Sequence, residues 1–101
     1  MPRVIYTQQA KNDLADILAR IAEHDRPAAR RMASAIRRRC LLIGRNPGMG
    51  RLRNDLYPGL RSTVVEVTYI IFSLARDRID YILRILHGAR DIDRSYFEDI
   101  D

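Results

Sequence analysis

A chain of 101 residues with 47% hydrophobic residues, 31% charged residues and a net charge of +5 suits one domain, over 1–101, with a modest core. No apolar run approaches the roughly 20 residues of a membrane span, and the first residues lack the apolar core of a signal peptide. Because Cys40 is the only cysteine, no internal disulfide is possible, and the sequence predicts a cytoplasmic protein.

Two helices are predicted in the amino-terminal half, after a short β-like run at 3–6. Apolar residues recur at helical spacing over 7–24, with Thr7 as the candidate N-cap. Pro27 suits the first turn of a second helix, which the breaker residues at 46–48 should end. Since only a few residues connect the two helices, we expect an antiparallel hairpin.

Three strands are predicted at about 60–66, 68–75 and 79–87, after a basic loop rich in glycine and proline at 46–59. A short helix is predicted over 90–98. The expected order is β-α-α-β-β-β, an α+β fold in which an amino-terminal strand and a helix hairpin pack with a small, mainly antiparallel sheet. We expect the first strand to pair beside a late one.

The last predicted strand is apolar on both faces. Strict alternation places Leu83 with Ile85 on one face, and Ile82, Arg84 and Leu86 on the other. We therefore expect a central strand that is covered on both sides.

Positive charge is concentrated in the middle of the chain. All but Lys11 of the 18 cationic residues are arginine, whose planar guanidinium binds phosphates and carboxylates in a fork. Residues 26–61 carry ten arginines against Asp55 alone, and the flanking segments are slightly acidic. This distribution favours an anionic partner, either a nucleic acid or an acidic polypeptide.

Six short motifs occur in order along the chain. They are Ala10-x-x-Asp13-Leu14-x-x-Ile17, Pro27-x-Ala29, Pro47-x-Met49-Gly50-Arg51, Asp55-Leu56-x-Pro58-Gly59-Leu60-Arg61-Ser62, Tyr69-x-Ile71-Phe72 and Ile85-Leu86-His87-Gly88-Ala89-Arg90-Asp91. Together they resemble the RelE/ParE superfamily, the toxins of bacterial type II toxin–antitoxin pairs, and the last motif is similar to the ParE branch. One departure is the turn Glu66-Val67-Thr68, which lacks the usual glycine and leaves the register of the next strand open.

The resemblance implies two alternative activities. ParE-like toxins poison DNA gyrase without bond-breaking chemistry, whereas RelE-like toxins cleave mRNA on the ribosome. It also implies a cognate antitoxin, ParD-like or of another DNA-binding type, whose disordered tail wraps the toxin in a hetero-oligomer. Operator DNA would then be reached only through the antitoxin, and no membrane, cofactor or metal is expected.

Arg51, Arg53 and Arg61 lie on or just after the glycine-rich loop, where they could hold a phosphate or an acidic antitoxin tail. The alternative is a solvated basic loop, and the family resemblance favours partner contact. Arginine stays protonated near neutral pH, so it can stabilise a transition-state phosphate but is a poor proton shuttle.

Arg84, His87 and Arg90 are the candidates near the end of the last strand. Arg84 could bind an anion, or it could form a salt bridge to Asp80 or Asp91. If the protein were an RNase, Arg61, Arg84 and His87 would be catalytic, and protons would be moved by His87 or by a tyrosine, with Tyr69, Tyr81 and Tyr96 as the candidates. We favour instead a hydrogen bond from His87 to the loop backbone. Arg90 is a candidate partner contact, although we favour pairing of Arg90 and Asp91 with neighbours at the start of the last helix.

Two further patterns have structural and functional interpretations. Tyr96 and Phe97 could dock the carboxy-terminal helix or contact gyrase, and the sequence does not decide between these. The arginines of the second helix are interpreted as a solvated face, because no base-reading motif accompanies them.

The sequence therefore predicts a ParE-like toxin that inhibits DNA gyrase. A RelE-like endoribonuclease and a weakly toxic co-repressor of the toxin–antitoxin operon remain the alternatives. Each of the three predicts that an antitoxin segment covers apolar surface on the helix hairpin or the sheet.

Overall fold

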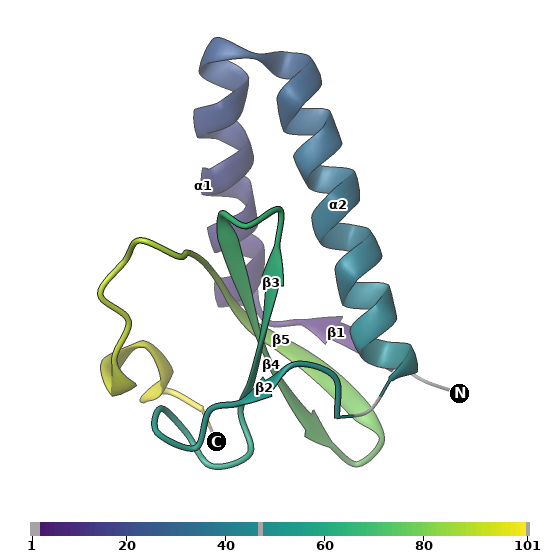
Figure 1. Cartoon of the computed structure of the whole chain (residues 1–101), viewed down its shortest axis with the longest axis vertical. Helices are drawn as coiled ribbons and strands as arrows, with labels where there is room; N and C mark the ends of the chain where they lie inside the picture. Colours follow the sequence, from purple (N-terminus) through teal and green to yellow (C-terminus); the bar gives the residue numbers. More distant parts are fainter. Residues whose placement is uncertain (1–2, 47, 101) are drawn as a thin grey trace.

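The computed structural model describes residues 3–46 and 48–100, so Pro47 of the predicted loop motif lies outside the described residues. The elements follow the predicted β-α-α-β-β-β order, with one additional short strand (Figure 1). In chain order they are β1 (Arg3–Tyr6), α1 (Gln8–His24), α2 (Arg26–Arg45), β2 (Arg51–Leu52), β3 (Arg61–Val65), β4 (Tyr69–Arg76), β5 (Ile79–His87) and the 3-10 helix η1 (Arg94–Phe97). The predicted terminal helix is thus reduced to one 3-10 turn.

The two helices form the expected antiparallel hairpin, with Asp25 as the only residue between them. The backbone N–H of Asp25 donates to the carbonyl of Ile21 at 2.8 Å, which ends α1. The Asp25 carboxylate accepts from the N–H of Ala28 at 3.0 Å, which caps the start of α2. Asp25 therefore satisfies one carbonyl at the end of α1 with its backbone and one N–H at the start of α2 with its side chain.

The strands form a single five-stranded sheet in the order β1-β5-β4-β3-β2. As predicted, β1 pairs with a late strand: it lies parallel to β5, and the other neighbours are antiparallel. The short edge strand β2 was not predicted, because two residues inside a glycine-rich loop carry no periodic signal.

A β-bulge at Leu83 corrects the predicted faces of β5. The pairing of β5 with β4 shifts there by one residue, so Leu83 has no partner of its own. Ile82 and Ile85 consequently both pack toward the helices, whereas Leu83 and Leu86 both pack on the opposite face. The strict alternation that grouped Leu83 with Ile85 is wrong.

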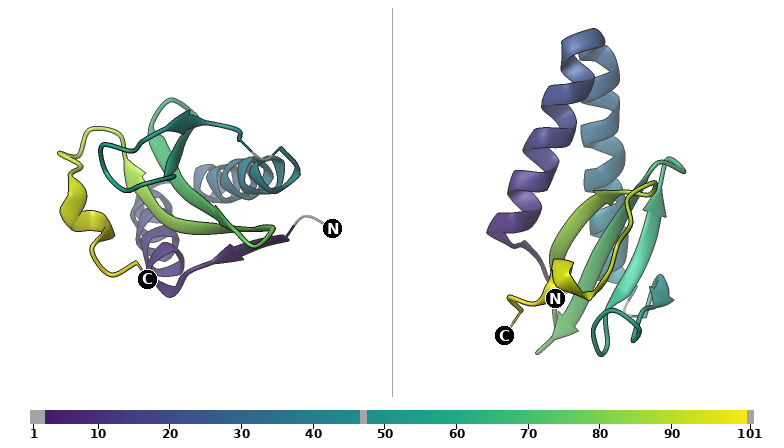
Figure 2. Two further views of the ribbon diagram at one scale, coloured as in Figure 1. Left: turned by 90° about the horizontal axis from the view of Figure 1, so that it is seen from below. Right: turned by 90° about the vertical axis from the view of Figure 1, so that its left-hand side faces the viewer.

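The sheet separates two apolar clusters, as expected for a strand covered on both sides. Ile36, Cys40 and Ile43 of α2 pack on one face, against Ile71 and other sheet residues. Residues of the carboxy-terminal segment pack on the opposite face, and Figure 2 shows the strands between that segment and α2. No helix in the described part of the chain is long and apolar enough to cross a membrane.

The β3–β4 turn settles the register that the sequence left open. Val65 pairs with Tyr69, so the three residues between them form the turn. Within it, Glu66 and Val67 have φ angles of 53° and 63°. A left-handed conformation is unfavourable for a β-branched residue, and the Val67 side chain is 94% exposed, so no packing compensates for it.

We therefore expect Val67→Asn to stabilise the protein by about 0.5–1 kcal/mol, since asparagine tolerates this conformation. Thermal unfolding should show a rise of a few degrees. Val64→Asn is the matched control: Val64 is 54% exposed on the regular strand β3, where asparagine should lower the melting temperature instead. Equal changes in both variants would contradict the strain argument.

Candidate functional site

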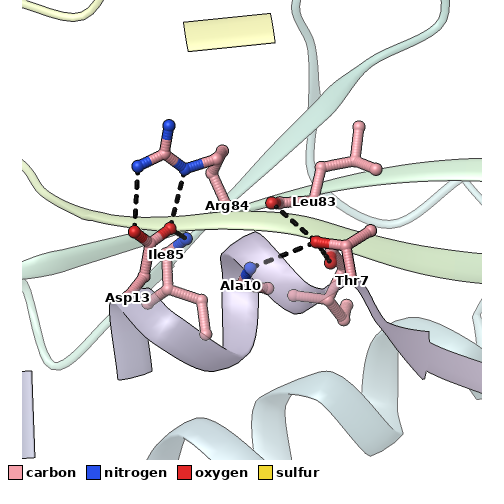
Figure 3. Close-up of polar contacts among 7 residues, drawn as sticks. Thr7, Ala10, Asp13, Leu83, Arg84 and Ile85 are labelled. Carbon is pink, nitrogen blue, oxygen red and sulfur yellow. Dashed lines mark hydrogen bonds and ion pairs between the residues drawn. The ribbon is translucent and has the colours of Figure 1, made fainter. Parts of the chain in front are cut away.

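A polar cluster closes the edge of β5 where its neighbour β1 ends (Figure 3). The Thr7 hydroxyl lies 3.1 Å from the carbonyl oxygens of both Ile82 and Leu83 and donates to this edge. The same oxygen accepts from the N–H of Ala10 at 3.1 Å as the N-cap of α1. Thr7 thus joins the start of α1 to the backbone of β5 just beyond the end of β1.

Asp13 of α1 continues this cluster and pairs with Arg84. Its carboxylate accepts from Nε and Nη2 of Arg84 at 2.8 and 2.9 Å, and from the backbone N–H of Ile85 at 3.1 Å. The side chains of Asp13 and Arg84 are only 10% and 15% exposed. The predicted pairing of Arg84 with Asp80 or Asp91 is wrong, because its partner lies on α1, far away in the sequence.

The third guanidinium nitrogen of Arg84 points away from Asp13 (Figure 3). Within the described residues, Nη1 makes no hydrogen bond, and the guanidinium carbon lies 5.2 Å from the ring centre of Tyr96, a cation–π contact. Arg84 also lines a cavity of about 510 Å³ together with Tyr81 and Leu74. Arg84 would therefore offer an anion in this cavity one free nitrogen rather than an open fork.

The basic loop holds its arginines partly in local contacts. Arg53 forms a two-point pair with Asp55, with both N–O distances at 3.1 Å, and these hydrogen bonds lower the pKa of Asp55. Arg61 donates from Nη1 to the carbonyl of Gly50 at 3.2 Å. Arg51 is exposed on β2, where it pairs with the backbone of Ser62 in β3.

The predicted site residues are divided among separate places. The pairing of β2 with β3 places Arg51 opposite Ser62 and Leu52 opposite Arg61, so the side chains of Arg51 and Arg61 point to opposite faces of the sheet. Arg61 lines a cavity of about 30 Å³, whereas Arg84 lines the one of about 510 Å³. His87 and Arg90 line a third cavity of about 290 Å³ beside α1. The structure thus does not join the predicted arginines and His87 in one site: the loop arginines point in different directions, and the late-strand residues line other cavities.

His87 makes the predicted hydrogen bond to the loop backbone. Its Nδ1 accepts from the N–H of Ala89 at 3.0 Å, and its ring stands edge-on to Tyr69 with centroids 5.4 Å apart. With Nδ1 occupied as an acceptor, the neutral ring carries its hydrogen on Nε2. Nε2 can then donate a hydrogen bond but has no lone pair to accept a proton, which makes the ring poorly suited to act as a general base.

Metal chemistry has no evident ligand set in residues 3–46 and 48–100, because no three histidine, cysteine or carboxylate residues come together there.

The carboxy-terminal aromatic residues divide between core and surface. Phe97 is 1% exposed and meets Phe72 edge-on, with ring centroids 5.1 Å apart. Nε of Arg94 donates to the carbonyl of Asp55 at 2.9 Å, which ties the segment to the basic loop. Of the two interpretations, docking therefore holds for Phe97, while Tyr96 is half-buried beside Arg84.

Sequence patterns did not reveal an apolar groove along the helix hairpin. This hairpin groove has a volume of about 410 Å³, and its lining includes Leu14, Leu18, Ala33 and Leu41, with the cations Lys11 and Arg37. Tyr6 and Cys40 also line it, and burial raises the pKa of both, so both stay neutral at physiological pH. Leu41 is 53% exposed. In the sequence, the sign of this groove was the position of Leu41, a large apolar residue outside the core-facing stripe of α2.

Comparison with known proteins agrees with this fold. The family model described as the ParE toxin of the type II toxin–antitoxin system parDE matches residues 4–92. A solved chain of the chromosomal ParDE system from P. aeruginosa superposes with a TM-score of 0.74 at 21% identity, covering 86% of this chain and 96% of that chain. No curated protein matches in sequence.

Proposed function

This chain belongs to the ParE toxin family of type II toxin–antitoxin systems, and from that premise we propose that it binds and inhibits DNA gyrase and is neutralised by a cognate antitoxin. The observation that carries the proposal is the family match, which spans most of the chain. Inhibition would occur through protein contact, and operator DNA would be read by the antitoxin.

The geometry near His87 supports a toxin without bond-breaking chemistry. RNA cleavage needs a group that removes the ribose 2′-hydroxyl proton, and the Nδ1 contact of His87 leaves its ring as a donor at Nε2. Arg84, the candidate on the same strand for holding a scissile phosphate, is already paired with Asp13. These contacts favour gyrase binding over the endoribonuclease alternative.

The hairpin groove is the surface that we propose for the antitoxin tail. It presents apolar side chains between the two helices, and Lys11 and Arg37 add positive charge at its margin. An amphipathic acidic segment would cover Leu41 and complement these cations. Without it, the free toxin would expose apolar surface and tend to associate.

Purified protein tested on purified gyrase separates the three candidate functions. We expect loss of supercoiling or accumulation of cleavage complexes, and an equal effect from the His87→Ala variant. Unchanged gyrase activity would exclude this target, and cut ribosome-bound mRNA would instead support the endoribonuclease. Normal growth on overexpression without antitoxin would support the weakly toxic co-repressor.

For the antitoxin surface, we expect Leu41→Asp to weaken antitoxin binding at least tenfold, about 1.4 kcal/mol, measured by calorimetry. The charge would be buried in the complex without a partner, whereas the free toxin should keep its melting temperature because Leu41 is half-exposed. Leu52→Asp provides the control, since Leu52 is 46% exposed on the distant edge strand β2. Equal loss of binding in both variants would place the antitoxin elsewhere.

A further inference from the structure

Helix α2 is basic along its whole length and contains no acidic residue. Its arginines are Arg26, Arg30, Arg31, Arg37, Arg38, Arg39 and Arg45. The two ion pairs formed among the described residues join Arg53 to Asp55 and Arg84 to Asp13, so no α2 arginine takes part in either. Within α2, Arg26 and Arg30 stand at the i and i+4 spacing at which like charges destabilise a helix, and neither forms an ion pair among the described residues.

Three of these arginines share one stripe on the outer side of the helix. Arg31, Arg38 and Arg45 recur every seven residues. At this spacing the direction of the side chain rotates by only about 20° around the helix axis per heptad, and the stripe from Arg31 to Arg45 is about 21 Å long. All three are exposed, on the side away from the buried residues Ile36 and Ile43. We call Arg31, Arg38 and Arg45 the arginine ridge.

The ridge is open to a long partner. Figures 1 and 2 show the turn end of the hairpin extending beyond the sheet, so the sheet does not cover that part of α2, and all three ridge arginines are exposed. Ser34 lies between Arg31 and Arg38 on the same face, and it adds a small hydroxyl rather than a bulky obstacle.

The side chains that α2 lacks narrow the class of partner. The helix has no aromatic residue on which single-stranded bases could stack, and no asparagine or glutamine to read base edges. Two large apolar side chains, Leu41 and Leu42, are exposed beside the ridge. Leu41 lines the hairpin groove, which leaves Leu42 as a single apolar anchor, fewer than the apolar core of a protein interface contains. Repeated arginine contacts without stacking, base reading or apolar anchors suit the phosphate backbone of duplex DNA.

We propose that the arginine ridge binds the phosphate backbone of duplex DNA without regard to sequence. This goes beyond gyrase inhibition and antitoxin binding, neither of which requires a nucleic-acid contact by the toxin. It also revises the interpretation of α2 as a merely solvated face, because the structure shows that these aligned arginines are exposed and form no ion pair among the described residues. Base-specific reading of the operator would remain with the antitoxin.

The test is the salt dependence of binding to a fluorescent duplex of about 20 bp and arbitrary sequence, followed by anisotropy from about 50 to 200 mM salt. The variant Arg31→Gln/Arg38→Gln/Arg45→Gln should lower the slope of log K against log salt by about 0.9 per lost contact, hence roughly 2.7. The control Arg3→Gln/Arg20→Gln/Arg78→Gln removes the same charge from three exposed arginines on other elements and should change the slope far less.

Three outcomes would overturn the proposal. One is wild-type protein that does not bind the duplex at the lowest salt, and another is an equal change of slope in both triple variants, which would reflect net charge alone. The third is tighter binding of single-stranded RNA that the ridge variant leaves intact. Equal melting temperatures of the two variants would show that α2 still folds, so a loss of binding could be assigned to the ridge.

Discussion

Replacing Asp13 by alanine is expected to cost about 3 kcal/mol of unfolding free energy. The carboxylate accepts three hydrogen bonds, two from Arg84 and one from the backbone N–H of Ile85. Its removal leaves a mostly buried guanidinium without a counter-ion and an unpaired strand N–H, each of which is costly. Urea denaturation should show a lower midpoint with an unchanged slope.

A double-mutant cycle distinguishes this pair from two independent losses. Arg84→Met should also destabilise the protein, but Asp13→Ala/Arg84→Met should lose clearly less than the sum, because the second change removes the unpaired charge left by the first. Asp16→Ala is the control on the exposed side of the same helix and should stay within about 0.5 kcal/mol of wild type. Strict additivity of Asp13→Ala and Arg84→Met would refute the coupling.

The bulge at Leu83 explains why the alternation of apolar residues assigned the faces of β5 wrongly. Alternation of apolar residues is a local signal, and it correctly located the strand and its coverage on both sides. The bulge at Leu83 interrupts that alternation at the point where Thr7 and Asp13 take over the strand edge from β1. These partners lie about 70 residues away in the chain, so no local pattern could reveal them.

The candidate site shows the same division between local and distant information. The hydrogen bond of His87 to Ala89 spans two residues and follows from the turn at Gly88, so it could be predicted. The partner of Arg84 could not be predicted, because it depends on how α1 crosses β5. The opposite directions of Arg51 and Arg61 follow from the pairing of β2 with β3, and a strand of two residues leaves no periodic pattern from which that pairing could be predicted.

Phe97→Ala is expected to destabilise the protein by about 3–5 kcal/mol, comparable with the Asp13 change. Phe97 is 1% exposed in the apolar cluster that covers the outer face of the sheet, and it contacts Phe72 edge-on. Truncation removes the aromatic contact and leaves a cavity under η1. The loss should appear in thermal unfolding as a fall of more than about 10 °C.

This variant also decides whether the end of the chain is core or target surface. If Phe97 acts by packing, gyrase inhibition should fall together with stability, and Phe97→Leu, which keeps most of the volume, should retain both. If Phe97 instead contacted the target directly, Phe97→Ala would keep its melting temperature and lose inhibition, contradicting the packing role. Tyr96→Ala is the companion variant. Because Tyr96 is half-buried against Arg84, its loss should lower stability less than Phe97→Ala does, so its effect on gyrase inhibition tests the surface of the carboxy-terminal segment.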